Sequence, residues 1–519
     1  MPKIHRALVS VFDKEGLVPF VRELVAMNIE ILSTGGTAYL LRENDLPVVQ
    51  VSDYTGFPEI LNGRVKTLHP KIHGGILALR DLTNQMDELE SYGIDPIDMV
   101  VVNLYPFLKV IQKKNVDEKE LQENIDIGGP TMIRSAAKNY PNVAVVTDPS
   151  QYAFILKELH ENDGEVTLET SRELAVKAFQ KTAHYDGIIA RYLGKKFQVP
   201  TETIPENLSL AFSQTYRLRY GENPHQKAGY YQDDLASEIT GLEQLHGIAL
   251  SYNNIVDVDA ALHLIQEFTE KPTVTIIKHT NPCGVGVGDT LLEAYERAKA
   301  TDPISSFGSI ICVNQKLDRP LAEKLRKHFV EVLLAPDFAP EALELLQQKK
   351  KLRILKFQPK VLNKVSVTLK SALNGVLLQE VDLIDLNESS LKVVTKREPT
   401  EEEWKALRFA WKIAKHVKSN AIVFTNDSMT LGVGAGQMSR VDSVELAAKK
   451  AKQAKLDLKS SVVASDAFFP FRDGLDAAVA AGATAVIQPG GSIRDEEVIQ
   501  AADEQKVAMV FTGIRHFRH

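Results

Sequence analysis

The sequence predicts an α/β protein of two units, and three features of its 519 residues support this prediction. From the N-terminus to about Gly194, short β-branched runs alternate with longer segments of helical periodicity, a pattern typical of a parallel sheet covered by helices. A polar stretch with two prolines follows, QVPTETIPENLSL, and we interpret it as a boundary between units. Beyond it, strands and helices alternate again, but the glycine-rich segments are longer.

The strands of the first unit are expected where β-branched residues cluster, at residues 7–12, 29–32, 48–51, 99–104 and 143–147, with helices such as 15–27 and 131–139 between them. In such sheets, ligands bind beyond the carboxyl ends of the strands. Polar or glycine-rich residues follow several of these strands, including Ser10, Asn103 and the turn 34–37. We therefore expect a ligand site at this edge.

The second unit repeats one order of features. A strand leading to Thr-Asn is followed by a Gly-Val-Gly segment, a helix and a further strand, once ending at residues 310–313 and once at 462–464. This order predicts an internal duplication of one α/β lobe.

Composition excludes several classes of function. There are 61 Lys and Arg residues against 68 Asp and Glu residues, so a net charge of −7 gives no general attraction for nucleic acid or anionic membranes. The longest apolar stretch, residues 477–487, is shorter than the roughly 20 residues that span a bilayer. We expect a soluble protein that binds neither nucleic acid nor membrane.

The two cysteines, Cys283 and Cys312, exclude a disulfide framework and every four-cysteine zinc site. Such sparse cysteine usage, with no signal peptide, favours a reducing, cytoplasmic setting. Pro282-Cys283 is similar to half of the PCxxC zinc motif of deaminases, but residue 286 is glycine and no second cysteine follows. We therefore expect no catalytic metal.

Three segments of the first unit are candidate anion sites. Ser10 with Lys14, and the turn 34–37, each follow a strand and open a helix, where free N–H groups favour a phosphate. The basic segment 64–75 adds a guanidinium, ammonium groups and a hydroxyl that can share one phosphate; alternatively, it is a solvated loop with core histidines. Without a Walker loop or GxGxxG, the predicted ligand is a mononucleotide or sugar phosphate.

Asp126 precedes Gly128-Gly129-Pro130, and we expect Pro130 at the first helical position. On this helix, Arg134 and Lys138 share a face with Thr131. Asp126 either begins the helix as a simple capping carboxylate or pairs with Lys138 and Tyr105 in a set that moves protons and polarises a carbonyl.

Lys278 and His279 follow a strand expected at residues 274–277. Adjacent strand side chains point to opposite faces, so both can serve one substrate only if the chain bends there, which the Thr-Asn-Pro sequence allows. We predict His279 to be a general base, the alternative being a structural histidine. Near the C-terminus, a buried strand at residues 507–513 would hold Arg515 near the ligand edge of its sheet.

Long motifs distributed over the whole chain resemble one family. They are SVFDKEGL, STGGTA, GRVKTLHP, NLYPF and IDIGGPTMIRSAAKN in the first unit, and RYGENPHQ, LSYNN, IIKHTNPCGVGVGD, DPISSFGS, GVGAGQMSR and SDAFFPFRDG in the second. This set is similar to the bifunctional enzymes that join AICAR transformylase to IMP cyclohydrolase. The resemblance implies a methylglyoxal-synthase-like cyclohydrolase domain over 1–196. It also implies a transformylase over 197–519, built of two cytidine-deaminase-like lobes, roughly 214–360 and 361–519, without zinc.

The resemblance also implies roles for individual residues of the first unit, which would close formyl-AICAR to IMP with loss of water. The nucleotide would be held by Ser10, Lys14, Thr34, Gly36, Thr37, Arg64, Lys66 and Thr67. Oxyanion stabilisation and proton transfer would fall to Lys66, Tyr105, Asp126 and Lys138.

The second unit would transfer the formyl group of 10-formyltetrahydrofolate to AICAR. His279 would be the base, Lys278 would stabilise the formyl oxygen and Asn426 would orient the histidine. AICAR would be held by Arg219, Tyr220, Glu331 and Arg515, and the folate side would be lined by Phe307, Phe468 and Pro470. A homodimer with sites shared between chains is implied as well. The alternatives are a nucleotide-binding regulatory protein without turnover, or a transformylase with a silent cyclohydrolase domain.

Overall fold

The computed structural model describes residues 2–113, 115–199, 204–236, 241–358 and 367–519. The chain divides into two compact units, one of Met1–Ser213 with Gln232–Ser237 and one of Gln214–Tyr231 with Glu238–His519. The boundary expected after residue 196 falls at the end of a helix inside the first unit. The boundary expected between residues 360 and 361 lies outside the described residues. Across the described ranges, no helix is long and apolar enough to cross a membrane.

The first unit contains a five-stranded sheet in which every neighbouring pair is parallel, as predicted. In spatial order its strands are β3 (Val49–Gln50), β2 (Glu30–Ser33), β1 (Arg6–Val11), β4 (Met99–Asn103) and β5 (Ala144–Val146). The observed ends differ from the expected ones by at most one residue, within the usual uncertainty of strand ends. Strands β4 and β5 are buried along their whole length.

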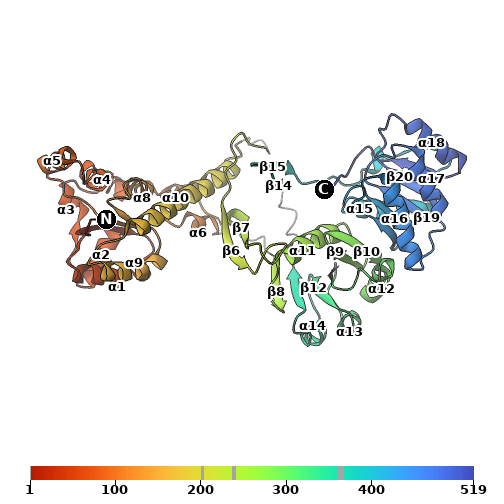
Figure 1. Cartoon of the computed structure of the whole chain (residues 1–519), viewed down its shortest axis with the longest axis horizontal. Helices are drawn as coiled ribbons and strands as arrows, with labels where there is room; N and C mark the ends of the chain where they lie inside the picture. Colours follow the sequence, from red (N-terminus) through yellow and green to blue (C-terminus); the bar gives the residue numbers. More distant parts are fainter. Residues whose placement is uncertain (1, 114, 200–203, 237–240, 359–366) are drawn as a thin grey trace. The chain divides into compact units, whose positions relative to one another are not determined.

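Helices of the first unit cover this sheet (Figure 1). They are α1 (Leu17–Ala26), α2 (Gly35–Glu43), α3 (Val51–Thr55), α4 (Pro70–Leu77), α5 (Thr83–Ser91), α6 (Phe107–Ile111), α7 (Glu118–Glu123), α8 (Gly128–Lys138), α9 (Tyr152–Glu161) and α10 (Leu168–Lys196), with short 3₁₀ turns at Leu61–Gly63, Pro149–Gln151 and Asp234–Ala236. The longer helices have an apolar stripe facing the core, and α1, for example, buries Leu17, Phe20, Val21 and Leu24, whereas the polar helices α5 and α7 each bury one leucine.

Helix α8 corrects one expectation. It begins at Gly128, so Pro130 is its third residue and not its first. Proline is tolerated there because the N–H groups of the first helical turn have no partner within the helix. Asp126 accepts the N–H of Gly129 (2.8 Å), which fixes the start of the helix before the proline.

The second unit contains two six-stranded sheets with the same topology, which confirms the predicted duplication. The first sheet has the order β10 (Asn281–Val287), β9 (Thr273–Lys278), β11 (Ser309–Val313), β12 (Val330–Ala335), β13 (Arg353–Phe357) and β8 (Leu242–His246). The second has the order β18 (Thr430–Gly434), β17 (Ile422–Thr425), β19 (Ser461–Ser465), β20 (Ala483–Gln488), β21 (Ala508–Phe511) and β16 (Lys392–Val393). In both, two antiparallel pairs are followed by two parallel pairs and a final antiparallel pair.

Four helices accompany each sheet; the first lobe is green and the second blue in Figure 1. They are α11 (Tyr252–Ile265), α12 (Leu291–Thr301), α13 (Arg319–Arg326) and α14 (Pro340–Gln347) in the first lobe, and α15 (Glu401–Ala414), α16 (Arg440–Gln453), α17 (Arg472–Ala481) and α18 (Asp495–Glu504) in the second. A 3₁₀ turn at Glu388–Ser390 and two hairpins, β6 (Phe212–Leu218) with β7 (Ala228–Asp233) and β14 (Val367–Ala372) with β15 (Gly375–Glu380), complete the described elements.

The glycine-rich segments of this unit serve strand–helix packing. A Cβ added to Gly284 would lie 1.9 Å from the carbonyl oxygen of Ala298 on α12. A Cβ added to Gly432, the equivalent glycine of the second lobe, would lie 2.4 Å from the carbonyl oxygen of Ala447 on α16. Only glycine permits such close approach of a strand to a helix. The repeated Gly-Val-Gly pattern therefore marks the same packing contact in both lobes.

Candidate active sites

The first candidate site lies at the carboxyl ends of β1 and β2. Ser10 and Thr34, one from each strand end, place their hydroxyl oxygens 3.3 Å apart. Thr34 is the N-cap of α2 and makes no side-chain cap, so the first N–H groups of this helix are not satisfied by it. The Lys66 ammonium lies beside the same turn, 3.7 Å from where a Cβ on Gly35 would be. Hydroxyls, a helix N-terminus and an ammonium group thus converge.

Lys14 and Lys66 are close enough to affect each other. Burial, followed by the charge of Lys66, lowers the pKa of Lys14. No salt bridge involves either ammonium group among the described residues, and Lys14 donates only to the carbonyl oxygen of Val11 (3.2 Å). Two neighbouring cations beside a helix N-terminus form an anion site.

Thr37, Thr67 and Gly36 differ in how far a ligand could reach them. The Thr37 hydroxyl donates to the carbonyl oxygen of Val11 (2.9 Å) and accepts its N–H (3.2 Å), so this side chain holds α2 against β1. Thr67 is buried, and its hydroxyl lies 2.9 Å from where a Cβ on Gly128 would be, at the start of α8. Gly36, by contrast, has open space where its Cβ would be, so a ligand can approach its backbone.

Arg64 is exposed, and its guanidinium forms a salt bridge with Glu123 at the end of α7. The sequence indicated Arg64 as a phosphate ligand and gave no sign of this partner. The Arg64 guanidinium is therefore already paired with a carboxylate, and a phosphate would have to replace Glu123 to bind there.

Asp126 lies at the other side of this site. Burial raises the pKa of its carboxyl group, although the N–H groups of Gly129 and Tyr105 and the charge of Lys66 act in the opposite direction. Lys138, on an exposed position of α8, forms no salt bridge with any described carboxylate. The structure thus brings Asp126 together with Lys66 and the Tyr105 backbone, and it does not bring Asp126 together with Lys138.

Two further residues hold the loops of this site: Tyr185, which the sequence did not indicate, and Asn103, which the sequence placed at the ligand edge without a role. The Tyr185 hydroxyl, from α10, accepts the Asp126 N–H (2.9 Å) and donates to the carbonyl oxygen of Asn124 (3.0 Å). Burial raises the pKa of Tyr185 to about 12, so this donor stays protonated. The Asn103 side chain accepts the N–H groups of Phe12 and Asp13 and so fixes the loop before Lys14.

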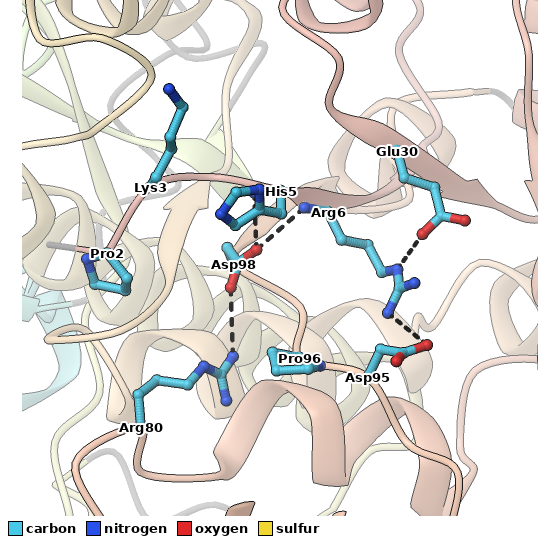
Figure 2. Close-up of a pocket in the computed structure, with 9 residues that line it drawn as sticks. All are labelled: Pro2, Lys3, His5, Arg6, Glu30, Arg80, Asp95, Pro96 and Asp98. Atoms are coloured by element: carbon cyan, nitrogen blue, oxygen red, sulfur yellow. Dashed lines mark hydrogen bonds and ion pairs between the residues drawn. The ribbon is translucent and has the colours of Figure 1, made fainter. Parts of the chain in front are cut away.

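A hollow of about 470 Å³ at the amino ends of the strands contains a second charged cluster (Figure 2). There, Asp98 accepts the backbone N–H groups of His5 (2.9 Å) and Arg6 (3.1 Å) and pairs with Arg80 (3.7 Å). Arg6 pairs with Asp95 (3.0 Å) and with Glu30. Most of these charges are paired within the cluster and hold the amino ends of β1 and β4 together, although the buried Arg80 Nε has no hydrogen-bond partner among the described residues.

The second candidate site surrounds the turn between β9 and β10. His279 and Thr280 form a two-residue turn in which both have positive φ, 52° and 63°. The chain therefore bends directly after Lys278, which is the condition for Lys278 and His279 to serve one substrate. The Lys278 ammonium donates to the carbonyl oxygen of Phe307 (2.9 Å), and His279 is exposed.

Further side chains gather near this turn. Glu331, on β12, accepts from Asn254 (2.9 Å) at the start of α11 and lies 4.0 Å from Arg353. Burial lowers the pKa of Arg353, while the nearby Glu331 and Tyr220 act to raise it. The guanidinium of Arg219 lies 5.7 Å from the Tyr220 ring centroid. The structure thus places the predicted Tyr220 and Glu331 near Arg353 and adds the Asn254 contact to Glu331, whereas Arg219 contacts Tyr220, its neighbour in sequence.

An exposed apolar patch adjoins Lys278. Phe307 is 60% exposed, and its ring lies 5.0 Å from that of Phe329, which is 45% exposed. Ile304 is 82% exposed nearby in sequence. Exposed aromatic rings beside polar groups are typical of a binding surface.

The remaining predicted residues lie in the second lobe. The Asn426 side chain accepts the N–H groups of Ser428 (2.9 Å) and Met429 (2.8 Å), so it closes its own turn; within the described chain it makes no contact with His279. Phe468 and Pro470 are half-buried after β19. Arg515 is exposed, with its guanidinium 4.4 Å from the Phe517 ring centroid.

Comparison with known proteins identifies the family. Residues 136–450 match the family described as AICARFT/IMPCHase bienzyme, and residues 16–131 match the MGS-like domain. The chain is 54% identical over 516 residues to the bifunctional purine biosynthesis protein PurH of Bacillus cereus (strain B4264), covering 99% of each protein. The chain belongs to the AICARFT/IMPCHase bienzyme family.

Two further relatives agree with this assignment. The chain is also 54% identical, over 516 residues and 99% of each protein, to the proteins called bifunctional purine biosynthesis protein PurH in Bacillus mycoides (strain KBAB4) and Bacillus anthracis (strain CDC 684 / NRRL 3495). Among solved structures, the crystal structure of ForH is 36% identical and covers 37% of this chain and 100% of its own, with a TM-score of 0.34.

As a member of the AICARFT/IMPCHase family, the protein is a bifunctional enzyme of purine biosynthesis, an AICAR formyltransferase and an IMP cyclohydrolase, with a folate-derived formyl donor. The MGS-like match coincides with the anion site of the first unit, since Lys14 is two residues before it and Lys66 and Asp126 are within it. The AICARFT/IMPCHase match includes the turn at Lys278 and His279.

Sequence reasoning did not assign Asn254, Asp257 or Arg353 to the site. Asn254 ends the LSYNN motif, which was noted without a role for any residue. Asp257 and Arg353 are single charged residues in a helix and at a strand start, where composition alone indicates a solvated position. Their contacts depend on how α11 packs beside β9 and β12, which only the tertiary structure shows.

Proposed function

We propose that each unit carries one of the two activities: the first unit closes the purine ring, and the second transfers the formyl group. For ring closure, the supporting observation is the pair of neighbouring cations, Lys14 and Lys66, at the N-terminus of α2. A nucleotide phosphate there would neutralise two charges that repel each other in the free protein.

In ring closure, the carboxamide nitrogen of formyl-AICAR attacks the formyl carbon and a C–N bond forms. The formyl oxygen becomes negatively charged, and the Lys66 ammonium stabilises it. One proton from the carboxamide nitrogen and one from the formyl-bearing nitrogen leave with this oxygen as water. Asp126, which burial makes easier to protonate, transfers protons with Tyr105. Lys138 lies at the opposite end of α8 from Asp126, so its proposed part in proton transfer requires direct contact with the substrate.

The phosphate would be held by Ser10, Lys14, Thr34 and Thr67, with the backbone of Gly36 and Thr37 at the helix N-terminus. Arg64 would exchange Glu123 for the phosphate when the nucleotide binds. The Thr37 hydroxyl itself remains with β1, so only its backbone serves the ligand.

In formyl transfer, the 5-amino nitrogen of AICAR attacks the formyl carbon of 10-formyltetrahydrofolate. A new C–N bond forms, the bond from the formyl carbon to N10 breaks, and N10 takes a proton as tetrahydrofolate leaves. His279 accepts the proton lost by the amine, and Lys278 stabilises the charge on the formyl oxygen. Support comes from the bend after Lys278, which allows both side chains to face one substrate. No metal ion takes part.

The AICAR ribose phosphate and base would contact Arg219, Tyr220, Glu331 and Arg515, and the folate would contact Phe307, Phe468 and Pro470. This assignment places part of the site in each lobe. Phe307 accepts a hydrogen bond from Lys278, next to His279, and within the described residues no hydrogen bond or ion pair joins the second-lobe residues Asn426 and Arg515 to this turn.

We therefore propose a homodimer, located in the cytoplasm, in which the second-lobe residues of one chain complete the first-lobe site of the other. Exposed apolar side chains on the hairpin β14–β15 support this proposal, because a partner chain could cover them. Leu369, Val376 and Leu377 are 41%, 52% and 60% exposed. A two-stranded hairpin is only marginally stable without packing on another element.

Mixing two inactive variants tests this proposal. Chains with His279→Ala and chains with Asn426→Ala should each lack formyl transfer, and subunit exchange should restore activity because every mixed dimer contains one intact site. Exchange is followed independently with tagged chains. Proven exchange without recovered activity would contradict the shared site, and a monomer in sedimentation experiments would contradict the homodimer.

A further inference from the structure

The turn that carries His279 has an unusual composition. Two-residue hairpin turns with positive φ at both positions are usually built from Asn-Gly or similar pairs, because glycine adopts this conformation without a clash. Here the residues are histidine and threonine, with φ of 52° and 63°. A β-branched residue with positive φ is an outlier. This conformation therefore needs support from outside the turn.

Asp257 supplies that support. It lies on α11, and its carboxylate accepts the N–H of Thr280 (2.6 Å) and also the N–H of His279. The two donors of the turn thus share one acceptor, which lies in a neighbouring helix and is half-buried. Burial raises the pKa of Asp257, and these two N–H groups with the His279 ring act to lower it.

The second lobe shows what the hairpin is like without such a carboxylate. Counted from the N-caps Ser251 and Thr400, which both form capping boxes, the position of Asp257 on α11 corresponds to Ala406 on α15. The turn from β17 to β18 is longer, contains no residue with positive φ, and is closed by its own Asn426. The carboxylate is present only in the lobe with the strained turn.

We propose that Asp257 is a positioning residue for formyl transfer, whose carboxylate holds the backbone of the His279–Thr280 turn so that Lys278 and His279 face the same substrate. This inference rests on the proposed roles of Lys278 and His279. Asp257 touches neither substrate nor reacting atoms in this account. It acts only through the two N–H groups of the turn.

The experiment compares Asp257→Ala, Asp257→Asn and the control Asp259→Ala, an exposed carboxylate two residues along the same helix. Asp257→Ala should lower the kcat of formyl transfer about 100-fold, since a displacement near 1 Å has this effect, and change KM for AICAR less than about threefold. Asp257→Asn keeps an oxygen acceptor for the turn, so its kcat for formyl transfer should fall by less than about fivefold. Asp259→Ala should match the wild type.

A second substitution separates positioning from general stability. Thr280→Gly removes the strain of positive φ, so in the Asp257→Ala background it should recover about tenfold of the lost kcat. Ring closure by the same proteins, measured with formyl-AICAR, should not change, and thermal unfolding shows whether the second unit is folded.

The outcomes distinguish this inference from the proposal on which it rests. Full activity of Asp257→Ala, an Asp257→Asn loss as large as that of Asp257→Ala, or no recovery with Thr280→Gly would each overturn the positioning role. His279→Ala is measured in parallel. If that variant retains full formyl transfer, the proposed role of His279 fails instead.

Discussion

The two lobes of the second unit share a scaffold and differ where the chemistry is placed. Both have the same strand order and orientation. In both, the third residue of the first helix contacts the second residue of the fourth strand of the sheet. Asn254 on α11 donates to Glu331 on β12 (2.9 Å), and Glu403 on α15 accepts from Thr484 on β20 (2.6 Å). Duplication therefore preserved individual side-chain contacts as well as topology.

The chemical meaning of this shared contact differs between the lobes. In the second lobe, Glu403 is 11% exposed and closed by Arg397 and Thr484, so it stabilises the fold. In the first lobe, Glu331 is 43% exposed, and its contact with Arg353 is long, at 4.0 Å. Its carboxylate is therefore accessible to a ligand. The same positions thus stabilise the fold in the second lobe, whereas in the first lobe we propose that they bind the substrate, on a scaffold that the second lobe shows to be stable without this role.

The largest effect should come from the turn that differs between the lobes. His279→Ala should lower the kcat of formyl transfer about 100- to 10,000-fold, because it removes the proposed general base. Steady-state assay of tetrahydrofolate release measures this, and ring closure by the same protein is the internal control. If this variant transfers the formyl group near the wild-type rate, the first-lobe turn does not carry the general base, and the proposed difference between the lobes is wrong.

The second-largest effect should come from a substitution in the first unit, outside both lobes. Lys66→Ala should lower ring closure about 100- to 1,000-fold, because a preorganised cation at the developing oxyanion is lost, and formyl transfer should continue unchanged. The rates are measured separately with formyl-AICAR and with AICAR plus the folate donor. Equal loss of both activities in a folded variant would mean that formyl transfer does not belong to the two lobes alone.

Glu331→Gln should have a smaller effect, on binding. The substitution keeps the side chain's size and removes its charge, so KM for AICAR should rise about tenfold, the loss of one charge-assisted hydrogen bond. The melting temperature should stay within about 1 °C of the wild type. A lowered melting temperature with unchanged KM would show that the first-lobe carboxylate is structural, like its counterpart Glu403.

The smallest effect should be on stability and depend on pH. Burial acts to raise the pKa of Glu403, but hydrogen bonds from Arg397, Thr484 and Thr400 outweigh it, so the pKa lies below 4.5. A lowered pKa in the folded state contributes stability above pH 4.5, and this contribution is lost as the pH falls through the folded-state pKa. Glu403→Gln should therefore cost about 1–3 kcal/mol at pH 7.

Denaturant unfolding at pH 7, 5.5 and 4 measures the difference between wild type and Glu403→Gln. The difference should be greatest at pH 7 and should shrink at pH 4. A difference independent of pH would show that the charge of Glu403 does not stabilise the second lobe.

The sequence was sufficient for the parts of the fold that depend on local pattern. The β-branched runs placed the five strands of the first sheet, and the repeated Thr-Asn and Gly-Val-Gly order predicted the duplication. Helix starts were less certain, because Pro130 is compatible with more than one position in the first turn.

The candidate sites were predicted in part, for a physical reason. Ser10 and Thr34 lie at the carboxyl ends of neighbouring parallel strands, so topology alone brings them together. Lys66 lies in the loop before α4, and its position beside Gly35 depends on how that loop packs. Contacts between distant elements could not be read from the sequence. The Arg64 pair with Glu123 and the Asp257 contact with the turn depend on how helices pack. Asn426 was expected at His279, and within the chain it closes its own turn.

Tracing products from AICAR and 10-formyltetrahydrofolate by chromatography tests the central claim, two separate activities with formyl transfer at the first-lobe turn. Wild type should produce IMP. Lys66→Ala should stop at formyl-AICAR, and His279→Ala should leave AICAR unchanged yet convert supplied formyl-AICAR to IMP. The account would be contradicted if either folded variant lost both steps, or if wild type released formyl-AICAR and never formed IMP.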